Sequence, residues 1–168
     1  MMNYGFRSKT KLYGATFTSR KPDAQATIIG SYEYPSVYGM AMFYQMPLGI
    51  LVVVEAKGLP FNREICAQAV YGVHIHDGTS CTGTKEDPFA DAKKHYNPFN
   101  CDHPHHAGDL PPLFGNDGYA WNSCFTNRFY LRDIIGKTII IHKDPDDFTT
   151  QPAGNSGQKI ACGVIYKR

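Results

Sequence analysis

The clearest structural signal in this chain is the segment Tyr71-Gly72-Val73-His74-Ile75-His76. Side chains of a β-strand point alternately to its two faces, so Val73 and Ile75 share one face, which suits a hydrophobic core. His74 and His76 share the other face and point toward one external position. The segment therefore predicts a strand with an apolar face and a histidine face, although a His-x-His pair alone is also typical of ordinary surface histidines.

Similar apolar segments recur along the rest of the chain. They are rich in Ile, Val and aromatic residues, and short polar or Pro/Gly turns separate them, with Asn116-Asp117-Gly118 as a strong turn signal. The expected strands cover residues 23–30, 39–45, 49–57, 68–76, 119–125, 137–142 and 159–166. A short helical turn is expected at 130–135. Seven or eight short strands without a long helix predict an all-β fold, either a sandwich or a barrel.

Two long polar connections do not follow this strand rhythm. They cover residues 77–113 and 143–158, and the first is rich in Pro, Asp, His and Asn. Structureless loops of this length are uncommon in compact domains unless they are functional or disordered. A metal ion bound inside the first loop would supply the order that its few apolar residues cannot.

Length and charge limit the domain organisation and the partners. A chain of 168 residues with a net charge of +2 predicts one domain and gives no reason to expect nucleic-acid binding. We expect the domain to cover residues 23–168. Residues 1–22 contain basic side chains and no acidic one, so we expect a flexible tail rather than an arm that binds polyanions. Its basic residues are Arg7, Lys9, Lys11, Arg20 and Lys21.

The sequence gives no reason to expect a membrane partner. The longest apolar run, residues 46–54, is too short to span a bilayer and contains Pro47 and Gly49. The first residues show no signal-peptide pattern, so we expect a cytoplasmic location slightly more than a secreted one.

Histidine is concentrated in the first long connection. Four of the seven histidines fall between His95 and His106, and His103, His106 and Asp109 follow the spacing His-x-x-His-x-x-Asp. Imidazoles with one carboxylate are suitable ligands for a tetrahedral zinc ion. A cupin-type site is an alternative for the His-x-His pair, but it would need a glutamate where Asp77-Gly78-Thr79 follows. His142 ends an Ile-rich strand and, alone, would more often be a core histidine.

Taken together, five spaced segments closely resemble the copper/zinc superoxide dismutase family of bacterial type. The resemblance extends from about residue 23 to the C-terminus. It implies an eight-stranded antiparallel Greek-key β-sandwich or barrel, and the conversion of superoxide to oxygen and hydrogen peroxide; we also consider a homodimer. The matching segments are Gly72-Val73-His74-Ile75-His76, His95-Tyr96-Asn97-Pro98, His106-Ala107-Gly108-Asp109-Leu110, His142 with Asp146, and residues 154–165.

The resemblance also implies a role for individual residues. It implies copper ligands His74, His76, His95 and His142. It implies zinc ligands His95, His103, His106 and Asp109. His95 would be shared by the two metals and would take up a proton when copper is reduced, whereas His105 is left as a surface residue. Asp146 resembles the carboxylate that accepts hydrogen bonds from His74 and His103 and orients both rings.

The five cysteines cannot all be paired within the chain. Cys81 and Cys162 resemble the disulfide of the family, which would tie the first loop to the last strand. Cys66, Cys101 and Cys124 have no counterpart in the common pattern. A second pair, Cys101 with Cys124, is one candidate, and buried free thiols are the other interpretation.

One position departs from the family pattern. Lys159 occupies the position of the active-site arginine, and lysine lacks the planar pair of donors that arginine offers to an anion. We expect Lys159 to be the catalytic cation and the activity to be reduced. The second hypothesis is a dismutase-like protein that binds copper and zinc with little or no turnover.

Overall fold

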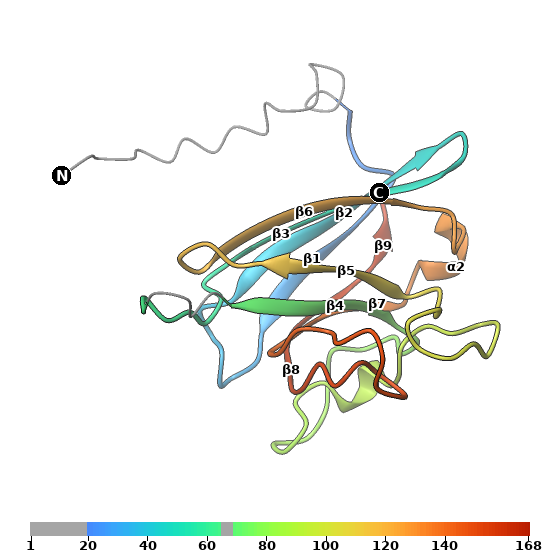
Figure 1. Ribbon diagram of the computed structural model, residues 1–168. Helices are drawn as coiled ribbons and strands as arrows, with labels where there is room; N and C mark the ends of the chain where they lie inside the picture. The colour runs from blue at the N-terminus through green and yellow to red at the C-terminus, as the bar shows by residue number, and fades with distance from the viewer. Residues whose placement is uncertain (1–19, 65–68) are drawn as a thin grey trace.

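The computed structural model describes residues 20–64 and 69–168, and the regular secondary structure of these residues is almost entirely β-strand (Figure 1). Most of the predicted basic tail and Cys66 lie outside the described residues. Eight strands make up the main sheet: β1 (Ala24–Gly30), β2 (Tyr38–Met46), β3 (Gly49–Lys57), β4 (Val70–His76), β5 (Asp109–Phe114), β6 (Tyr119–Thr126), β7 (Thr138–His142) and β8 (Lys159–Val164).

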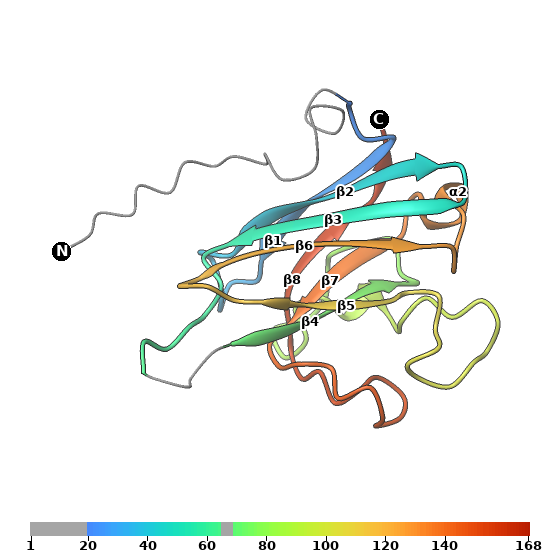
Figure 2. The ribbon, with the colours of Figure 1, turned by 45° about the horizontal axis from the view of Figure 1, so that its top comes forward.

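The strand order explains how this sheet becomes a barrel. Hydrogen-bonded neighbours follow the order β5-β4-β7-β8-β1-β2-β3-β6, each pair is antiparallel, and the two-residue strand β9 (Tyr166–Lys167) pairs with β1. The sheet curls until its two ends, β5 and β6, lie side by side (Figure 2). Nδ2 of Asn122 donates to the carbonyl of Pro112 across this gap, at 2.8 Å. The predicted eight-stranded antiparallel fold is confirmed as a nearly closed barrel.

The strand β5 corrects one prediction from the sequence. The first connection was expected to extend over 77–113, but it ends at Gly108 because Asp109–Phe114 pairs with β4. Pro111 and Pro112 conceal this strand, since proline has no amide hydrogen and is disfavoured within a sheet. The two prolines are tolerated because β5 is the last strand of the hydrogen-bonded order.

The predicted turn at Asn116-Asp117-Gly118 is confirmed. Asp117 and Gly118 have positive φ angles of 49° and 79°, as the tight turn of a hairpin between twisted strands requires. Backbone hydrogen bonds join Asn116 and Tyr119 in both directions. This turn reverses the chain between β5 and β6.

The barrel core confirms the two faces predicted for β4. Val73 and Ile75 are buried in the main core with Ile139 and Ile141 of the neighbouring β7. His74 and His76 are equally buried on the other face, with exposed fractions of 0% and 2%. Both faces of this part of the sheet are covered, because the two long connections lie over its outer side.

The connections 77–108 and 143–158 lie together below β4 and β7 in Figure 1. The first contains one turn of 3₁₀ helix, η1 (Ala90–Ala92), and the predicted helical turn at 130–135 is confirmed as α2 (Leu131–Ile134). No helix within residues 20–64 and 69–168 is long and apolar enough to cross a bilayer. The connections 77–108 and 143–158 thus cover the face of the sheet that carries His74 and His76.

Candidate metal centre

Four buried histidines form a first cluster, made of His74, His76, His95 and His142. The register of the sheet explains why three of them meet, namely His74 and His76 of β4 and His142 of β7. His74 lies opposite Ile140 in the antiparallel pair β4–β7, and His142, two residues further on, points to the same face. One nitrogen from each of the four rings lies within 4.8 Å of those of the others.

The fourth member, His95, is held beside β4 by backbone pairing. His95 forms an isolated bridge with His76, and the amide of Tyr96 donates to the carbonyl of Ile75 at 2.8 Å. The amide of Ile75 donates in turn to the carbonyl of Gly108. A Cβ at Gly108 would lie 2.3 Å from the Ile75 carbonyl oxygen, so this close approach requires glycine.

Hydrogen bonds set the orientation of the rings in the first cluster. Nδ1 of His76 donates to the carbonyl of Lys93 at 2.8 Å, and Nδ1 of His142 donates to the carbonyl of Gly157 at 3.2 Å. Their two Nε2 atoms consequently face each other, 3.2 Å apart. Nδ1 of His74 and Nε2 of His95 are buried without a hydrogen-bond partner among the described residues. Such convergent, unsatisfied nitrogens are the arrangement that a metal ion would complete.

A second cluster contains His95, His103, His106 and Asp109. The Nδ1 atoms of its three rings converge on the carboxylate of Asp109, at 2.8 Å from His95, 3.1 Å from His103 and 3.3 Å from His106. The contacts of His103 and His106 are close approaches without hydrogen-bond geometry, so Nδ1 of neither ring has a hydrogen-bond partner within the described part of the chain. Three imidazole nitrogens and one carboxylate fit the donor set of a tetrahedral zinc site.

Asp146 connects the two clusters. Oδ2 lies 2.7 Å from Nε2 of His74, and Oδ1 lies 2.8 Å from Nε2 of His103. The amide of Phe148 also donates to Oδ1, at 2.7 Å. Burial alone would raise the pKa of this carboxyl group, but the hydrogen bonds from His74, Phe148 and His103 outweigh it and hold the pKa well below its usual range.

Electrostatics favour the protonation states that bind metals. Burial lowers the pKa of His74 to about 4 and that of His142 to about 3, and it also lowers the pKa of His76. These rings are therefore neutral at pH 7. Burial would raise the pKa of Asp109, but its hydrogen bond with His95 more than offsets this, so the pKa is lowered and the carboxylate is charged.

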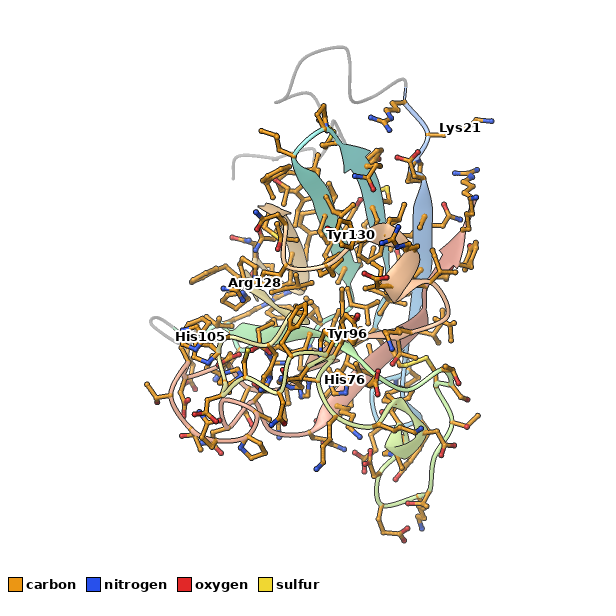
Figure 3. All side chains as sticks on the ribbon, turned by 90° about the vertical axis from the view of Figure 1, so that its right-hand side faces the viewer. Lys21, His76, Tyr96, His105, Arg128 and Tyr130 are labelled. Carbon is orange, nitrogen blue, oxygen red and sulfur yellow. A yellow bond between two sulfur atoms is a disulfide. The ribbon has the colours of Figure 1, made fainter. Side chains whose placement is uncertain are left out.

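His105 lies apart from both clusters. Its side chain is exposed, and Figure 3 shows it at the margin of the molecule, whereas His76 lies inside. Its backbone amide donates to the carbonyl of Asp102 at 2.8 Å, within a turn. The sequence interpretation of His105 as a surface residue agrees with this placement.

Of the two cysteine pairs considered from the sequence, only one is confirmed. Cys81 and Cys162 form a disulfide that joins the first loop to β8 and packs against Phe89 and Ile140. The candidate second pair is wrong, because Cys101 and Cys124 are both free. The alternative prediction, a buried free thiol, does not hold for Cys101, which is exposed. Cys124 is partly buried, and this burial raises the pKa of its thiol to about 11.

Lys159 begins β8 beside the first cluster, opposite His142 in the β7–β8 register. Its ammonium group contacts two acceptors from the first loop, Oδ2 of Asp87 at 2.8 Å and the carbonyl of Phe89 at 3.0 Å. Sequence reasoning did not find Asp87, because nothing in a loop sequence indicates which strand residue a carboxylate will meet.

Sequence reasoning also missed a cation that supports the second cluster. Nη1 of Arg128 donates to two backbone carbonyls of the first loop, those of Pro104 at 3.2 Å and His106 at 3.4 Å, and to that of Asp109 at the start of β5, at 3.4 Å. Figure 3 shows Arg128 close to His105 on this side of the molecule. Only the fold of the loop reveals this contact, because backbone carbonyls carry no sequence signal.

Comparisons with known proteins agree with this geometry. The family described as copper/zinc superoxide dismutase (SODC) matches residues 37–165. The chain is 36% identical over 147 residues to a superoxide dismutase [Cu-Zn] of Deinococcus radiodurans, covering 77% of each chain. It is 35% identical over 144 residues to superoxide dismutase [Cu-Zn] 2 of Aquifex aeolicus, covering 77% of this chain and 79% of the relative.

A solved structure has the same architecture. The Cu/Zn superoxide dismutase from Brucella abortus superposes with a TM-score of 0.71 at 25% sequence identity. The superposition covers 84% of this chain and 98% of that chain. The similarity therefore extends over nearly the whole length of that protein.

Proposed function

Because this chain belongs to the copper/zinc superoxide dismutase family and is a superoxide dismutase, we propose that its two histidine clusters hold the two metals. The reaction converts two superoxide ions and two protons to oxygen and hydrogen peroxide. The proposed copper ligands are His74, His76, His95 and His142. The proposed zinc ligands are His95, His103, His106 and Asp109.

The chemistry of the donors supports this division. Four imidazoles suit divalent copper, and a carboxylate added to three imidazoles suits zinc. Copper bound at the first cluster would accept an electron from one superoxide ion and pass it to the next. The unsatisfied nitrogens of His74, His103 and His106 are each buried and directed toward a cluster, which supports both sites.

His95 is the residue best placed to handle a proton. Its Nδ1 is held by Asp109 at 2.8 Å, while its Nε2 faces the first cluster and has no hydrogen-bond partner among the described residues. We propose that Nε2 takes up a proton in one half of the cycle and gives it to the forming peroxide in the other. Zinc held by Nδ1 of His95 and by Asp109 would keep the ring in place during both halves.

Lys159 is proposed to attract the anionic substrate. Lys159 lies at the start of β8, opposite His142, and its side chain is only 17% exposed. We also propose that the enzyme is slower than a relative with arginine at this position, because lysine lacks the planar pair of donors. Zinc at the second cluster is proposed to order the loop 77–108, which contains few buried apolar side chains of its own.

The convergence of four buried histidines on one point carries the proposal, and the rate of superoxide consumption tests it. Protein loaded with copper and zinc should consume superoxide far faster than metal-free protein and than an equal amount of free copper with a chelator. His76→Ala should lose copper and this activity while it retains zinc. A loaded protein with full copper content and no rate above free copper would instead support a metal-binding protein without turnover.

A homodimer is a further proposal. Trp121 and Phe125 of β6 lie on one face of the strand with exposed fractions of 37% and 55%. Exposed aromatic side chains of this kind are enriched at interfaces. Sedimentation equilibrium of the full chain would give twice the monomer mass if the proposal holds, and the monomer mass at micromolar concentration would contradict it.

A further inference from the structure

The cation beside the copper cluster is paired with a carboxylate. Nζ of Lys159 lies 2.8 Å from Oδ2 of Asp87 and 3.0 Å from the carbonyl oxygen of Phe89. The lysine side chain is 17% exposed, and that of Asp87 is 48% exposed. The positive charge is thus set back from the surface, and the negative charge beside it is the more accessible of the two.

The position of Asp87 is well defined by its own loop. Its Oδ1 accepts a hydrogen bond from the amide of Phe89 at 3.3 Å, and its amide donates to Oγ1 of Thr84 at 3.1 Å. Phe89 packs against the disulfide cysteine Cys162 and against Ile140. Both acceptors of the lysine are therefore anchored to the barrel, so the pair is a built feature rather than a chance meeting of two flexible surface side chains.

A second carboxylate lies close to the start of β8. Nε2 of Gln158, the residue before Lys159, donates to Oε2 of Glu33 at 2.6 Å. The side chain of Lys159 and that of the residue just before β8 thus both contact a carboxylate. Both carboxylates oppose the surplus of positive charge that long-range attraction of an anion requires.

Pairing changes how Lys159 can act on an anion. A single charge attracts over a distance limited by the salt-dependent screening length, about 8 Å at physiological ionic strength. When an opposite charge lies 2.8 Å away, the two contributions largely cancel at such distances. At contact distance, however, the ammonium group can still donate a hydrogen bond with its remaining N–H.

We propose that Asp87 is a positioning residue that fixes the ammonium group of Lys159 and offsets its charge, so that this site captures small anions by short-range hydrogen bonding rather than long-range attraction. The inference rests on the proposed function, in which Lys159 attracts superoxide. It adds Asp87 to the capture of superoxide. It also gives a reason for a reduced rate of dismutation that does not depend on lysine replacing arginine.

The test is Asp87→Asn in the full chain loaded with copper and zinc. Asparagine keeps one oxygen for the amide of Phe89, but it removes the charge and replaces the oxygen that accepts from Lys159 with an amide NH2 group. The carbonyl of Phe89 is then left to hold the ammonium group. We expect kcat/KM for superoxide to rise about threefold to tenfold at low ionic strength, because an unpaired Lys159 would attract the anion over a longer distance and speed its association. The wild-type rate should change little with salt, whereas that of the variant should fall steeply as salt increases.

Azide binding supplies a readout that does not depend on turnover. Titration of the copper absorption band should show tighter azide binding for Asp87→Asn, again with a steeper dependence on salt. Glu86→Gln is the matched control, because it removes the same charge from the adjacent exposed residue and should change neither quantity. In a Lys159→Gln background, Asp87→Asn removes a charge that repels superoxide but leaves no cation at this position, so the rate should not exceed that of the wild type.

The outcomes are distinguishable. An Asp87→Asn protein with normal metal content and melting temperature, but with an unchanged or lower rate and unchanged azide affinity, would overturn the inference. An equal gain from Glu86→Gln would also overturn it, since the effect would then be one of general charge. A loaded wild-type protein no faster than free copper would reject the proposed function, and the azide titrations would still decide whether Asp87 offsets Lys159.

Discussion

Oδ2 of Asp146 lies 2.7 Å from Nε2 of His74, although 72 residues separate them along the chain. The other oxygen of the same carboxylate lies 2.8 Å from Nε2 of His103. A single side chain thus orients one ring of each cluster and exposes the opposite nitrogen of each ring to its metal position. A change at Asp146 would therefore affect the orientation of a proposed ligand in both metal sites.

Replacement of Asp146 should weaken both sites. Asp146→Ala removes the acceptor from His74 and His103, so we expect copper and zinc affinity to fall by about 10–100-fold. Competition with chelators of known affinity measures each metal separately. Asp147→Ala is a suitable control, because Asp147 bonds to Thr149 and Thr150 of its own loop and to neither ring. Equal losses in both variants would mean that the loop, not the carboxylate, matters.

Removal of Asp109 should release zinc before copper. Its carboxylate is the point on which three Nδ1 atoms converge, so Asp109→Ala should lower zinc affinity and loosen the loop 77–108 while the barrel stays folded. Zinc titration and limited proteolysis measure the two effects. His106→Ala should behave alike, whereas the exposed His105→Ala should be nearly silent. A silent His106→Ala would contradict the assignment of the second cluster.

Arg128 should stabilise the same loop without touching a metal ligand side chain. Arg128→Ala leaves the carbonyls of Pro104, His106 and Asp109 to water, and we expect a loss of about 1 kcal/mol in unfolding free energy. Amide hydrogen exchange should accelerate over residues 102–109 more than elsewhere. Arg128→Lys should recover part of the protection, because one ammonium group can still reach one or two carbonyls. Exchange that is unchanged in Arg128→Ala would refute this role.

The metal-free protein should lose stability as the pH falls from 7 to 5. Burial lowers the pKa of His74 to about 4 and of His142 to about 3, below the ordinary value of 6.5. The unfolded chain therefore binds more protons in this window, and unfolding becomes more favourable as pH decreases. At pH 5 the effect is about 2 kcal/mol for each of the two rings.

Thermal unfolding of metal-free protein at several pH values measures this slope. The carboxyl groups of Asp109 and Asp146 change this slope little. The stability that their lowered pKa values contribute is present at higher pH and is lost only as the pH falls below about 5. His142→Gln should show a shallower slope than the wild type between pH 7 and 5. A wild-type melting temperature that is constant over this range would show that these rings are not held neutral.

Lys159 should matter for rate and not for metal content. Lys159→Ala removes the cation and leaves the carboxylate of Asp87 without its partner Lys159, so that it repels the anionic substrate. We therefore expect the rate of dismutation to fall several-fold. Lys159→Arg should hold or raise the rate, since a guanidinium group can bond Asp87 and still present a donor to the anion. Pulse radiolysis with metal analysis of each variant is the measurement. A rate that is the same in all three proteins would exclude Lys159 from substrate capture.

The amino-acid sequence alone determined the parts of this protein that depend on local spacing. Alternation in Tyr71 to His76 was enough to separate core from histidine face, because side-chain direction in a strand has a period of two. Positive φ angles at Asp117 and Gly118 were predictable from the residue types in the turn. The ligand spacing around His103, His106 and Asp109 likewise indicated a metal site.

The tertiary structure decided what depends on contacts between distant segments. Strand β5 was hidden by Pro111 and Pro112, and only its position at the end of the ladder makes those prolines acceptable. The pairing of Lys159 with Asp87, and the contact of Arg128 with three carbonyls, arise where loops fold back on the barrel. Such contacts join residues of ordinary type at no fixed spacing, so no pattern along the chain marks them before the strands bring them together.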